Sequence, residues 1–447
     1  MLDDFHSAYL SRWLKRKINS ISYYRYKLRL LANCMTYADA SQGVSVISNG
    51  QSSRILGPRA CNHSWACPEC TARVMKNYSA RIAAGIDALA ENGYSASMLT
   101  FTVFHTAMMS CEETFLLLNK AWTLFDKNKT WSRKRKTPLT RKQPTDSTVT
   151  DTYKSGGAWS NFYRTFECKH TVKTLETTYG KHGWHPHIHM LIWVKSSDLQ
   201  KLAEWESKLN EQWASCVDRA AKQILTDERR YNVRKFLESK ETREDALHLG
   251  VHISKTEDGK IKRWSSADYL CGWGGENELT GLGLKSARGN NMTPFEMLEK
   301  AQQLEQTNIT ESNRLVELYL AFAWTVIKHR ISRIQFSRTG LKAIIDTHLQ
   351  TERFKEIIKK KKEHANVAPY QNIVWLSKKQ WCDICASDNV YLIPLIRHFA
   401  KYLDGKDGPC AFDLISELLV AHNIAPPIFK KHPVKDYAKS FNEIIAA

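Results

Sequence analysis

Apolar residues recur with two different periods along the chain. Segment 97–105 (SMLTFTVFH) is rich in β-branched and aromatic residues and predicts a strand, and segment 162–180 has the composition of paired strands. Spacings of three and four residues predict helices, first over 111–125 and then along two longer apolar stripes. These stripes are formed by Leu199, Leu202, Trp205, Leu209, Trp213 and Val217, and by Leu315, Leu318, Tyr319, Phe322 and Val326. The predicted strands lie in the middle of the chain, and the pattern beyond about residue 290 is helical.

Two long polar segments interrupt these elements. Residues 126–157 are rich in Lys, Arg, Thr and Ser, and a second charged segment ends at Arg263. This composition predicts loops between core elements. The part from Lys127 to Lys142 is basic enough to contact phosphates, and a solvated insertion is the alternative.

The length and charge of the chain limit its class. A chain of 447 residues exceeds what one core usually serves, which predicts two or three domains. Its 65 Lys and Arg residues against 46 Asp and Glu residues give a net charge of +19, which favours a polyanionic partner. We find no apolar run that could span a membrane and no signal-peptide core. We therefore expect a cytoplasmic protein whose 11 cysteines stay reduced and can bind metal.

Three histidines at alternate positions open an apolar segment in the sequence GWHPHIHMLIWV. On a strand, His185, His187 and His189 share one face, and the other face is apolar. Imidazoles two positions apart on a rigid strand can converge on one divalent ion. Pro186 lacks an N–H and places this end of the strand at an edge or rim. The pattern predicts a metal site with these three histidines as candidate ligands; histidines bonded only to backbone or solvent are the alternative.

A carboxylate ligand is expected from the strand that precedes the histidines. Glu176 lies a hairpin's length before them, in the sequence KTLETTYG. One carboxylate with two imidazoles suits Mg²⁺ or Mn²⁺, because hard oxygen ligands and open positions leave room for a phosphate oxygen. Glu176 is therefore the predicted third ligand, and a solvated strand residue is the alternative.

A second candidate metal site lies in the cysteine-rich sequence CNHSWACPEC. Cys67 and Cys70 have the C-x₂-C spacing that grips a tetrahedral zinc ion, and Cys61 adds a third thiolate. Either Cys34 or His63 can complete the set. We predict a structural zinc ion here, with free buried cysteines as the alternative.

The order of these motifs resembles the HUH endonuclease superfamily, in which two histidines flank a hydrophobic residue, here His187, Ile188 and His189. The closer resemblance is to the replication initiator (Rep) proteins of rolling-circle plasmids, and it covers most of the first 345 residues. MLTFTV resembles their first motif, LETTYGKHGWHPHIHMLIWV the second and YLCGWGGENELTG the third. The resemblance to their N-terminal region also favours Cys34 as the fourth zinc ligand.

Pattern and resemblance together predict an α+β protein with three regions. Residues 1–90 are expected to form an N-terminal zinc-binding region, 91–290 an HUH endonuclease domain and 291–447 a C-terminal helical domain. The central domain is expected to hold an antiparallel sheet with helices on one face, as in HUH nucleases.

The resemblance implies a metal-dependent DNA endonuclease and strand transferase that nicks single-stranded or hairpin origin DNA for rolling-circle replication. A tyrosine hydroxyl attacks a DNA phosphate and leaves a free 3′-OH and a 5′-phosphotyrosine, while Mg²⁺ or Mn²⁺ on His187, His189 and Glu176 polarises the phosphate. Tyr269 is the expected nucleophile, because it begins a stretch that resembles the family's Y-x-x-K. The sequence departs from that pattern at Gly272, where the family has lysine.

This departure leaves two possibilities for activating the tyrosine. Either Tyr269 works without the lysine, or a basic residue such as Lys285 or Arg288 replaces it. Some relatives carry their tyrosine four residues later, where this chain has Trp273, which cannot attack a phosphate.

Other residues near the motifs have weaker claims to a catalytic role. Tyr179 and Tyr231 are alternative nucleophiles. Glu276 and Glu278 are possible general bases that activate water to release the enzyme after termination, and solvated charges are the alternative.

The sequence contains no G-x-x-x-x-G-K-[ST], so the chain should not unwind DNA by itself. A host helicase and a DNA polymerase are therefore expected partners. A relaxase or a single-strand transposase would use the same chemistry. A non-enzymatic DNA-binding regulator stabilised by zinc, with the histidine strand as a second structural site, is the alternative from a different class.

Overall fold

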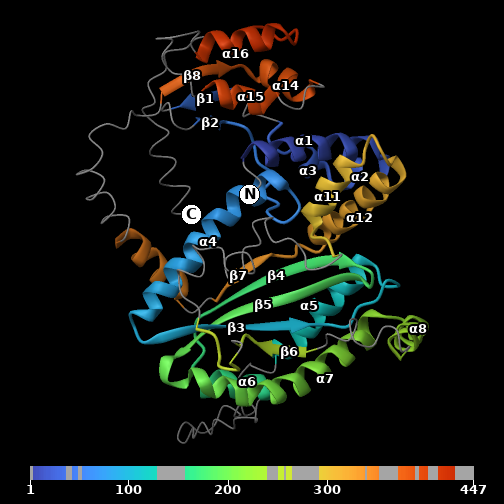
Figure 1. The fold of residues 1–447 in the computed structure, drawn as a ribbon, viewed down its shortest axis with the longest axis vertical. Coiled ribbons are helices and arrows are strands. Elements are labelled where there is room, and N and C mark those ends of the chain that lie inside the picture. The colour runs from blue at the N-terminus through green and yellow to red at the C-terminus, as the bar shows by residue number, and fades with distance from the viewer. Residues whose placement is uncertain are drawn as a thin grey trace, which may run out of the picture. The chain divides into compact units, whose positions relative to one another are not determined.

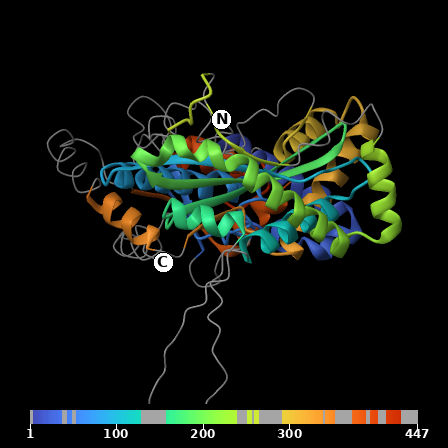
Figure 2. The same ribbon diagram turned by 90° about the horizontal axis from the view of Figure 1, so that it is seen from below.

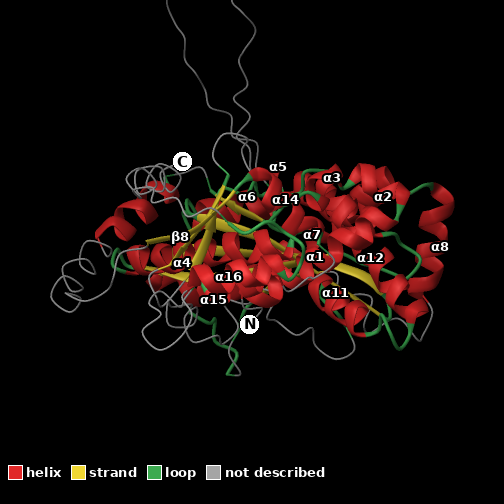
Figure 3. Cartoon of the chain, turned by 90° about the horizontal axis from the view of Figure 1, so that it is seen from above, coloured by secondary structure: helices red, strands yellow, loops and turns green. Residues whose placement is uncertain are grey.

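A computed structural model describes the chain, which divides into two units. The described residues are 4–36, 43–48, 53–127, 157–238, 250–255, 258–263, 291–337, 340–351, 371–387, 392–400 and 411–427. The first unit comprises Met1–Val74, Met297–Ile327 and Glu352–Ala447, and the second comprises Met75–Glu296 and Lys328–Thr351. Each unit combines helices with an antiparallel sheet (Figures 1 and 3), so the protein is α+β as predicted.

The second unit is built around a five-stranded sheet. In spatial order its strands are β6 (Gly250–Ile253), β3 (Tyr94–Thr102), β5 (Gly183–Lys195), β4 (Thr171–Gly180) and β7 (Ile334–Phe336). Every pairing in this sheet is antiparallel, which confirms the predicted central sheet. The histidine strand β5 therefore lies in the middle of the sheet (Figure 1). Pro186 lies near the N-terminal end of this strand.

Strands β4 and β5 form a hairpin whose turn fixes their register. Gly180 pairs with Gly183 across a turn of two residues, Lys181 and His182. Gly183 has a φ of +84°, which an L residue with a side chain rarely adopts. A Cβ added at Gly183 would also lie only 2.8 Å from the carbonyl oxygen of Thr106. Glycine is therefore required here by both backbone conformation and space.

The apolar face of this sheet is covered by helices α5 (Cys111–Lys127), α6 (Ala158–Thr165) and α7 (Glu206–Ile224). Figure 2 shows α7 running along the sheet. Phe101 of β3 lies at the centre of the aromatic core, with ring centroids 5.2 to 5.9 Å from those of Trp122, Phe125, Trp159 and Trp213. Burial of one such side chain contributes about 2–3 kcal/mol, so this cluster is a main source of stability for the sheet.

The predicted stripe that begins at Leu199 is divided between two helices. Residues Ser196–Trp205 form η1, a 3-10 helix, and Glu206–Ile224 form α7, which is followed by α8 (Asp227–Glu238). Apart from Trp205, the apolar residues of the stripe are buried. The buried face was predicted correctly, but apolar spacing alone did not distinguish the tighter helix from the α-helix.

Helices also contact the opposite face of the sheet, which carries the histidines. A Cβ added at Gly85 of α4 (Pro68–Ala90) would lie 3.2 Å from Ile345 and 3.8 Å from Trp193 of β5. The sheet thus has helices on both faces, where the pattern predicted them on one. The physical reason is that Leu191 and Trp193 share the histidine face and need apolar cover, which leaves only the histidine end for polar chemistry.

The helical part of the first unit brings together segments that are far apart in the sequence. It contains α1 (Asp4–Ser20), α2 (Ser22–Lys27), α3 (Arg29–Ala32) and most of α11 (Pro294–Gln303) and α12 (Ile309–Lys328). On α12, the buried hydroxyl of Tyr319 donates a 2.7 Å hydrogen bond to the carbonyl oxygen of Ala66. Trp65 packs edge-on against Phe322, with centroids 5.6 Å apart. Residues near the cysteine cluster are thus fixed to α12.

The first unit also contains a three-stranded antiparallel sheet. Its strands are β2 (Ser53–Leu56), β1 (Val44–Ser48) and β8 (Gln371–Leu376), and α14 (Lys378–Ala386), α15 (Leu392–Phe399) and α16 (Ala411–Val420) share a core with them (Figures 1 and 3). β8 lies in a region where the pattern predicted helices. Its pairing with β1, more than 300 residues earlier in the chain, makes it a strand.

Phe101→Ala should destabilise the second unit by about 3–5 kcal/mol, because it removes the ring at the centre of the aromatic core and leaves a cavity. Urea unfolding of the full chain followed by far-UV circular dichroism measures this loss. Tyr231→Ala is the control, since Tyr231 is 66% exposed and its removal should change stability by less than about 0.5 kcal/mol. Equal midpoints for both variants would contradict the assigned core.

Candidate metal centres and their surroundings

Glu176, His187 and His189 converge on one side of the five-stranded sheet. The carboxylate Oε2 of Glu176 lies 3.3 Å from Nε2 of His187 and 3.1 Å from Nε2 of His189. One ligand atom from each of the three side chains lies within 4.8 Å of the other two, which is close enough to hold one metal ion. The group consists of two imidazoles and one carboxylate, as the sequence predicts.

The strand register explains why these three side chains meet. Glu176 is paired directly with His187, and Thr174 is paired with His189, so all four side chains lie on one face of the β4–β5 hairpin. A shift of one residue would move Glu176 to the aromatic face. The site therefore depends on the hairpin turn.

Hydrogen bonds to the other ring nitrogens orient the two imidazoles. Nδ1 of His189 lies 2.9 Å from the hydroxyl of Thr100 on β3, and Nδ1 of His187 lies 3.3 Å from the carbonyl oxygen of His185. These contacts leave both Nε2 atoms directed at Glu176. Outer contacts of this kind select the ring orientation of metal-binding histidines.

The group is almost fully withdrawn from solvent. Glu176 is 8% exposed and His189 is 5% exposed. Burial is the largest influence on the Glu176 pKa and raises it, but hydrogen bonds and charge from His187 and His189 together hold that pKa well below its usual range. An ionised carboxylate in such a place needs positive charge beside it, and a divalent cation satisfies this need.

His185 lies outside this three-residue group among the described residues, although it belongs to the same strand face. Its ring stacks on the ring of His105 with centroids 4.3 Å apart and an angle of 10° between the planes, and its centroid lies 5.3 Å from that of His187. His105 is 4% exposed and follows β3, whose last residue, Thr102, is paired with His187. Pairing of the two predicted strands would have placed His105 near His185.

Arg333 also lies near the site, and the sequence pattern did not predict it. Its backbone carbonyl accepts a 2.8 Å hydrogen bond from the N–H of Leu175, next to Glu176 in β4. Arg333 is 8% exposed; burial lowers its pKa to about 10, and the negative charge of Glu176 opposes that shift. A guanidinium remains charged at neutral pH under these conditions, so the site includes a buried positive charge.

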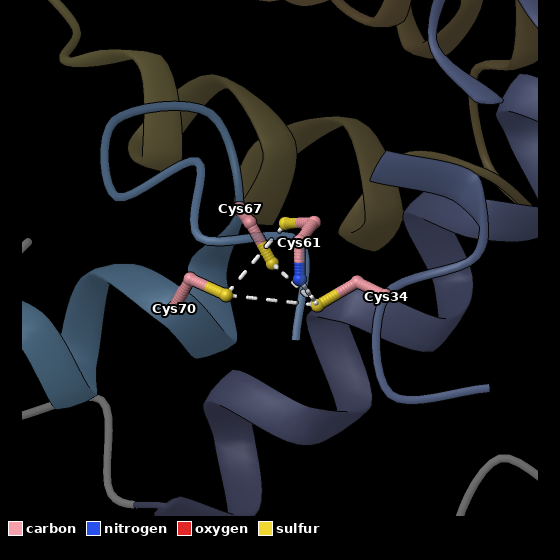
Figure 4. Close-up of side chains that lie close together, drawn as sticks. All are labelled: Cys34, Cys61, Cys67 and Cys70. Atoms are coloured by element: carbon pink, nitrogen blue, oxygen red, sulfur yellow. Dashed lines mark hydrogen bonds between the residues drawn. The ribbon is translucent and has the colours of Figure 1, made fainter. Parts of the chain in front are cut away.

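The four predicted zinc ligands form a compact cluster in the first unit (Figure 4). Cys34 follows α3, and Cys61 lies in the loop after β2. Cys67 directly precedes α4, and Cys70 lies in its first turn. Three Sγ–Sγ distances, Cys34–Cys70, Cys61–Cys70 and Cys34–Cys67, are 3.6 Å. Thiolates about 2.3 Å from a central zinc ion would lie about 3.8 Å apart at the corners of a tetrahedron, so the cluster fits that ion.

Hydrogen bonds among the four thiols lower the pKa of Cys34 and Cys70 and raise the pKa of Cys61 and Cys67. Hydrogen bonding from Cys61, followed by that from Cys67, lowers the pKa of Cys34 to about 7. The backbone N–H of Cys61 donates a 3.3 Å hydrogen bond to Sγ of Cys34. Cys34, rather than His63, is the fourth member of the group. Cys34 and Cys67 are buried, which is typical of a structural site.

Several predicted residues lie outside the described residues. These are Tyr269, Gly272, Trp273, Glu276, Glu278, Lys285 and Arg288, together with the basic segment 128–142. Of the weaker candidates, Tyr179 forms a backbone bridge to Met292 and packs against Trp184. Tyr231 lies on α8 and is 66% exposed.

The C-x-x-C pair Cys382 and Cys385 lies on α14 and is separate from the four-cysteine cluster. Sγ of Cys385 donates a 3.8 Å hydrogen bond to the carbonyl oxygen of Met35, and burial raises the pKa of this thiol to about 11. Trp381 also donates to the same carbonyl, at 3.0 Å. In this arrangement Cys385 packs next to the segment that carries Cys34.

The fold and the two clusters define an α+β protein with a four-cysteine site and a separate Glu/His/His site. The chain is 26% identical over 303 residues to a protein of Streptomyces lividans described as "Protein rep". The match covers 60% of this chain and 58% of that protein, so this chain spans less than two thirds of its relative. No protein-family model matches the chain, and no solved structure does. None of the described helices has the length and apolar character needed to cross a membrane.

Cys34→Ser should lose about one equivalent of zinc, whereas His63→Ala should retain it. The reason is that Cys34 belongs to the four-residue group that could hold the ion and His63 does not. Zinc content of the purified proteins, measured by inductively coupled plasma spectrometry, compares the two variants. Cys382→Ser controls for the general loss of a thiol. Zinc lost from the His63 variant and kept by the Cys34 variant would refute the assignment.

Glu176→Gln should weaken Mn²⁺ binding by about 10-fold or more, since it removes the charged oxygen ligand while keeping nearly the same shape. The electron paramagnetic resonance signal of free Mn²⁺ measures the affinity of the zinc-loaded protein. Glu206→Gln is the matched control. Glu206 does not belong to the Glu/His/His group, and its carboxylate forms an ion pair with Lys255 at 2.5 Å. If both variants bind Mn²⁺ equally well, the Glu/His/His group is not the Mn²⁺ site.

Proposed function

We propose that this chain is a replication initiator that nicks single-stranded origin DNA and begins rolling-circle replication. The convergence of Glu176, His187 and His189 carries the proposal, because this ligand set leaves coordination positions open for a phosphate oxygen. The similarity to the protein described as "Protein rep" supports a role in replication. The order of the three motifs, and the resemblance to HUH endonucleases that they give, supports the nicking chemistry.

The charges of the chain suit a DNA substrate. A net charge of +19 attracts the phosphate backbone and raises the rate of encounter. Glu176, His187 and His189 would hold Mg²⁺ or Mn²⁺, which when bound stabilises negative charge on the scissile phosphate. The buried guanidinium of Arg333 offsets the charge of the Glu176 carboxylate within the protein. These groups together prepare an electropositive place for a phosphate.

The cleavage step is a transfer of a phosphoryl group from one oxygen to another. The hydroxyl oxygen of Tyr269 forms a bond to phosphorus, and the bond from phosphorus to the 3′ oxygen breaks. The proton lost by the phenol is balanced by the proton gained by the 3′-OH, and the 5′ phosphate remains as an ester of tyrosine. The ester conserves the energy of the broken bond, so the 3′-OH can reverse the step and rejoin strands without ATP.

The proposed reaction requires other proteins. The free 3′-OH is a primer for a host DNA polymerase, and a host helicase is needed because the sequence has no P-loop. Glu276 or Glu278 would serve as the general base if water releases the enzyme from DNA at the end of replication.

The alternative of a non-enzymatic regulator is less consistent with the chemistry of the two clusters. Structural metal sites are usually closed by four protein ligands, as in the cysteine cluster. The Glu/His/His group has three protein ligands with a carboxylate among them, which is typical of a site that also binds substrate or water. The two clusters therefore differ as a structural site differs from a reactive one.

The protein should be incubated with Mn²⁺ and a set of single-stranded oligonucleotides that together cover the replicon on which the gene of the protein lies. We expect the protein to cleave one of these oligonucleotides. It should also leave a protein–DNA adduct that survives detergent. Tyr269→Phe should abolish the adduct and keep DNA binding, because only the attacking oxygen is removed. Tyr231→Phe is the matched control and should form the adduct normally. The adduct is detected as a shifted band in a denaturing gel.

His187→Ala should abolish both cleavage and the adduct, because it removes a proposed ligand of the metal ion that polarises the phosphate. Retarded DNA without cleavage by the unmodified protein would favour the regulator. An adduct that persists in Tyr269→Phe would show that another residue is the nucleophile.

A further inference from the structure

The corner formed by the three N-terminal helices contains a surface pocket of about 740 Å³. This size lies within the range of pockets that bind small ligands or single nucleotides. The end of α1 and the short helices α2 and α3 surround it. Its polar lining comprises Asn19, Ser22, Arg25, Tyr26, Arg29 and Asn33. The pocket belongs to the first unit and uses none of the residues of either metal cluster.

Two tyrosines of this corner are exposed. Tyr26, in the pocket wall, is 83% exposed, and Tyr23 on the same helix is 56% exposed. Tyrosine contributes to folding mainly when its ring is buried, so neither ring supports the core of the unit. The ammonium group of Lys27 lies 3.7 Å from the centroid of the Tyr23 ring, which places a cation beside the exposed aromatic surface.

The charge of the pocket complements a polyanion. Arg25 and Arg29 are both exposed and both line the pocket, and none of the lining residues is acidic. Asn19, Ser22 and Asn33 add neutral groups that can donate and accept hydrogen bonds. Guanidinium groups beside an exposed aromatic ring form the combination that single-stranded nucleic acids require, with phosphates on the cations and a base on the ring.

We propose that this pocket binds a nucleotide of single-stranded DNA, with its base stacked on Tyr26 and its neighbouring phosphates on Arg25 and Arg29. The choice of DNA as occupant rests on the proposed function, which requires the chain to hold a single strand. Duplex DNA fits less well, because its stacked bases present only their edges in the grooves. The pocket would retain the strand independently of the metal that supports cleavage.

The cysteine cluster adjoins one wall of this pocket. Asn33 lines the pocket and directly precedes Cys34, and its backbone N–H donates a 3.0 Å hydrogen bond to the carbonyl oxygen of Arg29. On the other side of Cys34, the N–H of Met35 donates a 2.8 Å hydrogen bond to the carbonyl oxygen of Arg59. Backbone hydrogen bonds on both sides of Cys34 therefore hold the end of a helix that has only four residues.

Fluorescence anisotropy with a labelled 20-nucleotide oligo-dT, in buffer without added divalent metal, tests the pocket in the full chain. Tyr26→Ala should weaken this binding by about 5- to 150-fold, the effect of losing one base stack, and leave duplex binding unchanged. Tyr26→Trp should retain binding, because tryptophan also stacks. Tyr231→Ala is the matched control, as Tyr231 is a similarly exposed tyrosine of the second unit.

The two arginines are tested through the salt dependence of the same binding. The double variant Arg25→Ala/Arg29→Ala should reduce the slope of log K against log salt concentration by about 1.4, since each phosphate contact on a single strand contributes about 0.7. Lys201→Ala/Lys222→Ala removes the same charge from exposed ion pairs of the second unit and should leave the slope unchanged. Zinc content and circular dichroism verify that each variant is folded.

Unchanged oligo-dT binding in Tyr26→Ala would overturn the proposal, as would an equal loss of single-strand and duplex binding. Equal losses in the arginine and lysine double variants would show attraction by overall charge instead of a site. None of these outcomes affects the adduct assay on Tyr269, so failure of the pocket and failure of the nicking function can be distinguished.

Discussion

The antiparallel register of β4 and β5 is the constraint on which the chemistry of the second unit depends. It places Glu176 opposite His187 on one face, while the residues between the histidines pack into the aromatic core on the other. Gly183 sets this register, because only glycine accepts the conformation and the closeness of Thr106 at the turn. A site made of two adjacent strands in the middle of a sheet is more rigid than one made of loops, as metal geometry requires.

Burial gives this site its electrostatic character. A carboxylate that is only 8% exposed is costly unless hydrogen bonds and nearby cations stabilise it. Here two imidazoles hydrogen-bond to Glu176, and the guanidinium of Arg333 supplies positive charge. A divalent ion held by the three side chains would add positive charge beside Glu176. The same balance that keeps Glu176 ionised therefore favours metal over solvent in the site. The stacked pair His105 and His185 extends this row of imidazoles into the protein.

The first unit follows a different principle, since its four cysteines come from three separate segments of the chain. A metal ion shared by such segments contributes directly to folding, because no site exists before the chain is folded. Tyr319 and Phe322 of α12 strengthen the same region through contacts with Ala66 and Trp65. The cluster thereby orders short helices that would be unstable alone, among them the corner that carries the exposed tyrosines.

The sequence determined the features that depend on local spacing. Alternation along one strand predicted the histidine face, and the C-x₂-C spacing predicted the cysteine cluster, because both patterns arise from neighbouring residues. The resemblance already favoured Cys34 over His63, and the structure places Cys34 in the four-cysteine group. Tertiary structure alone decided the placing of Arg333 near Glu176 and the strand β8. Each of these depends on segments distant in the chain, as β8 depends on β1, and local periodicity contains no information on which distant segments pair.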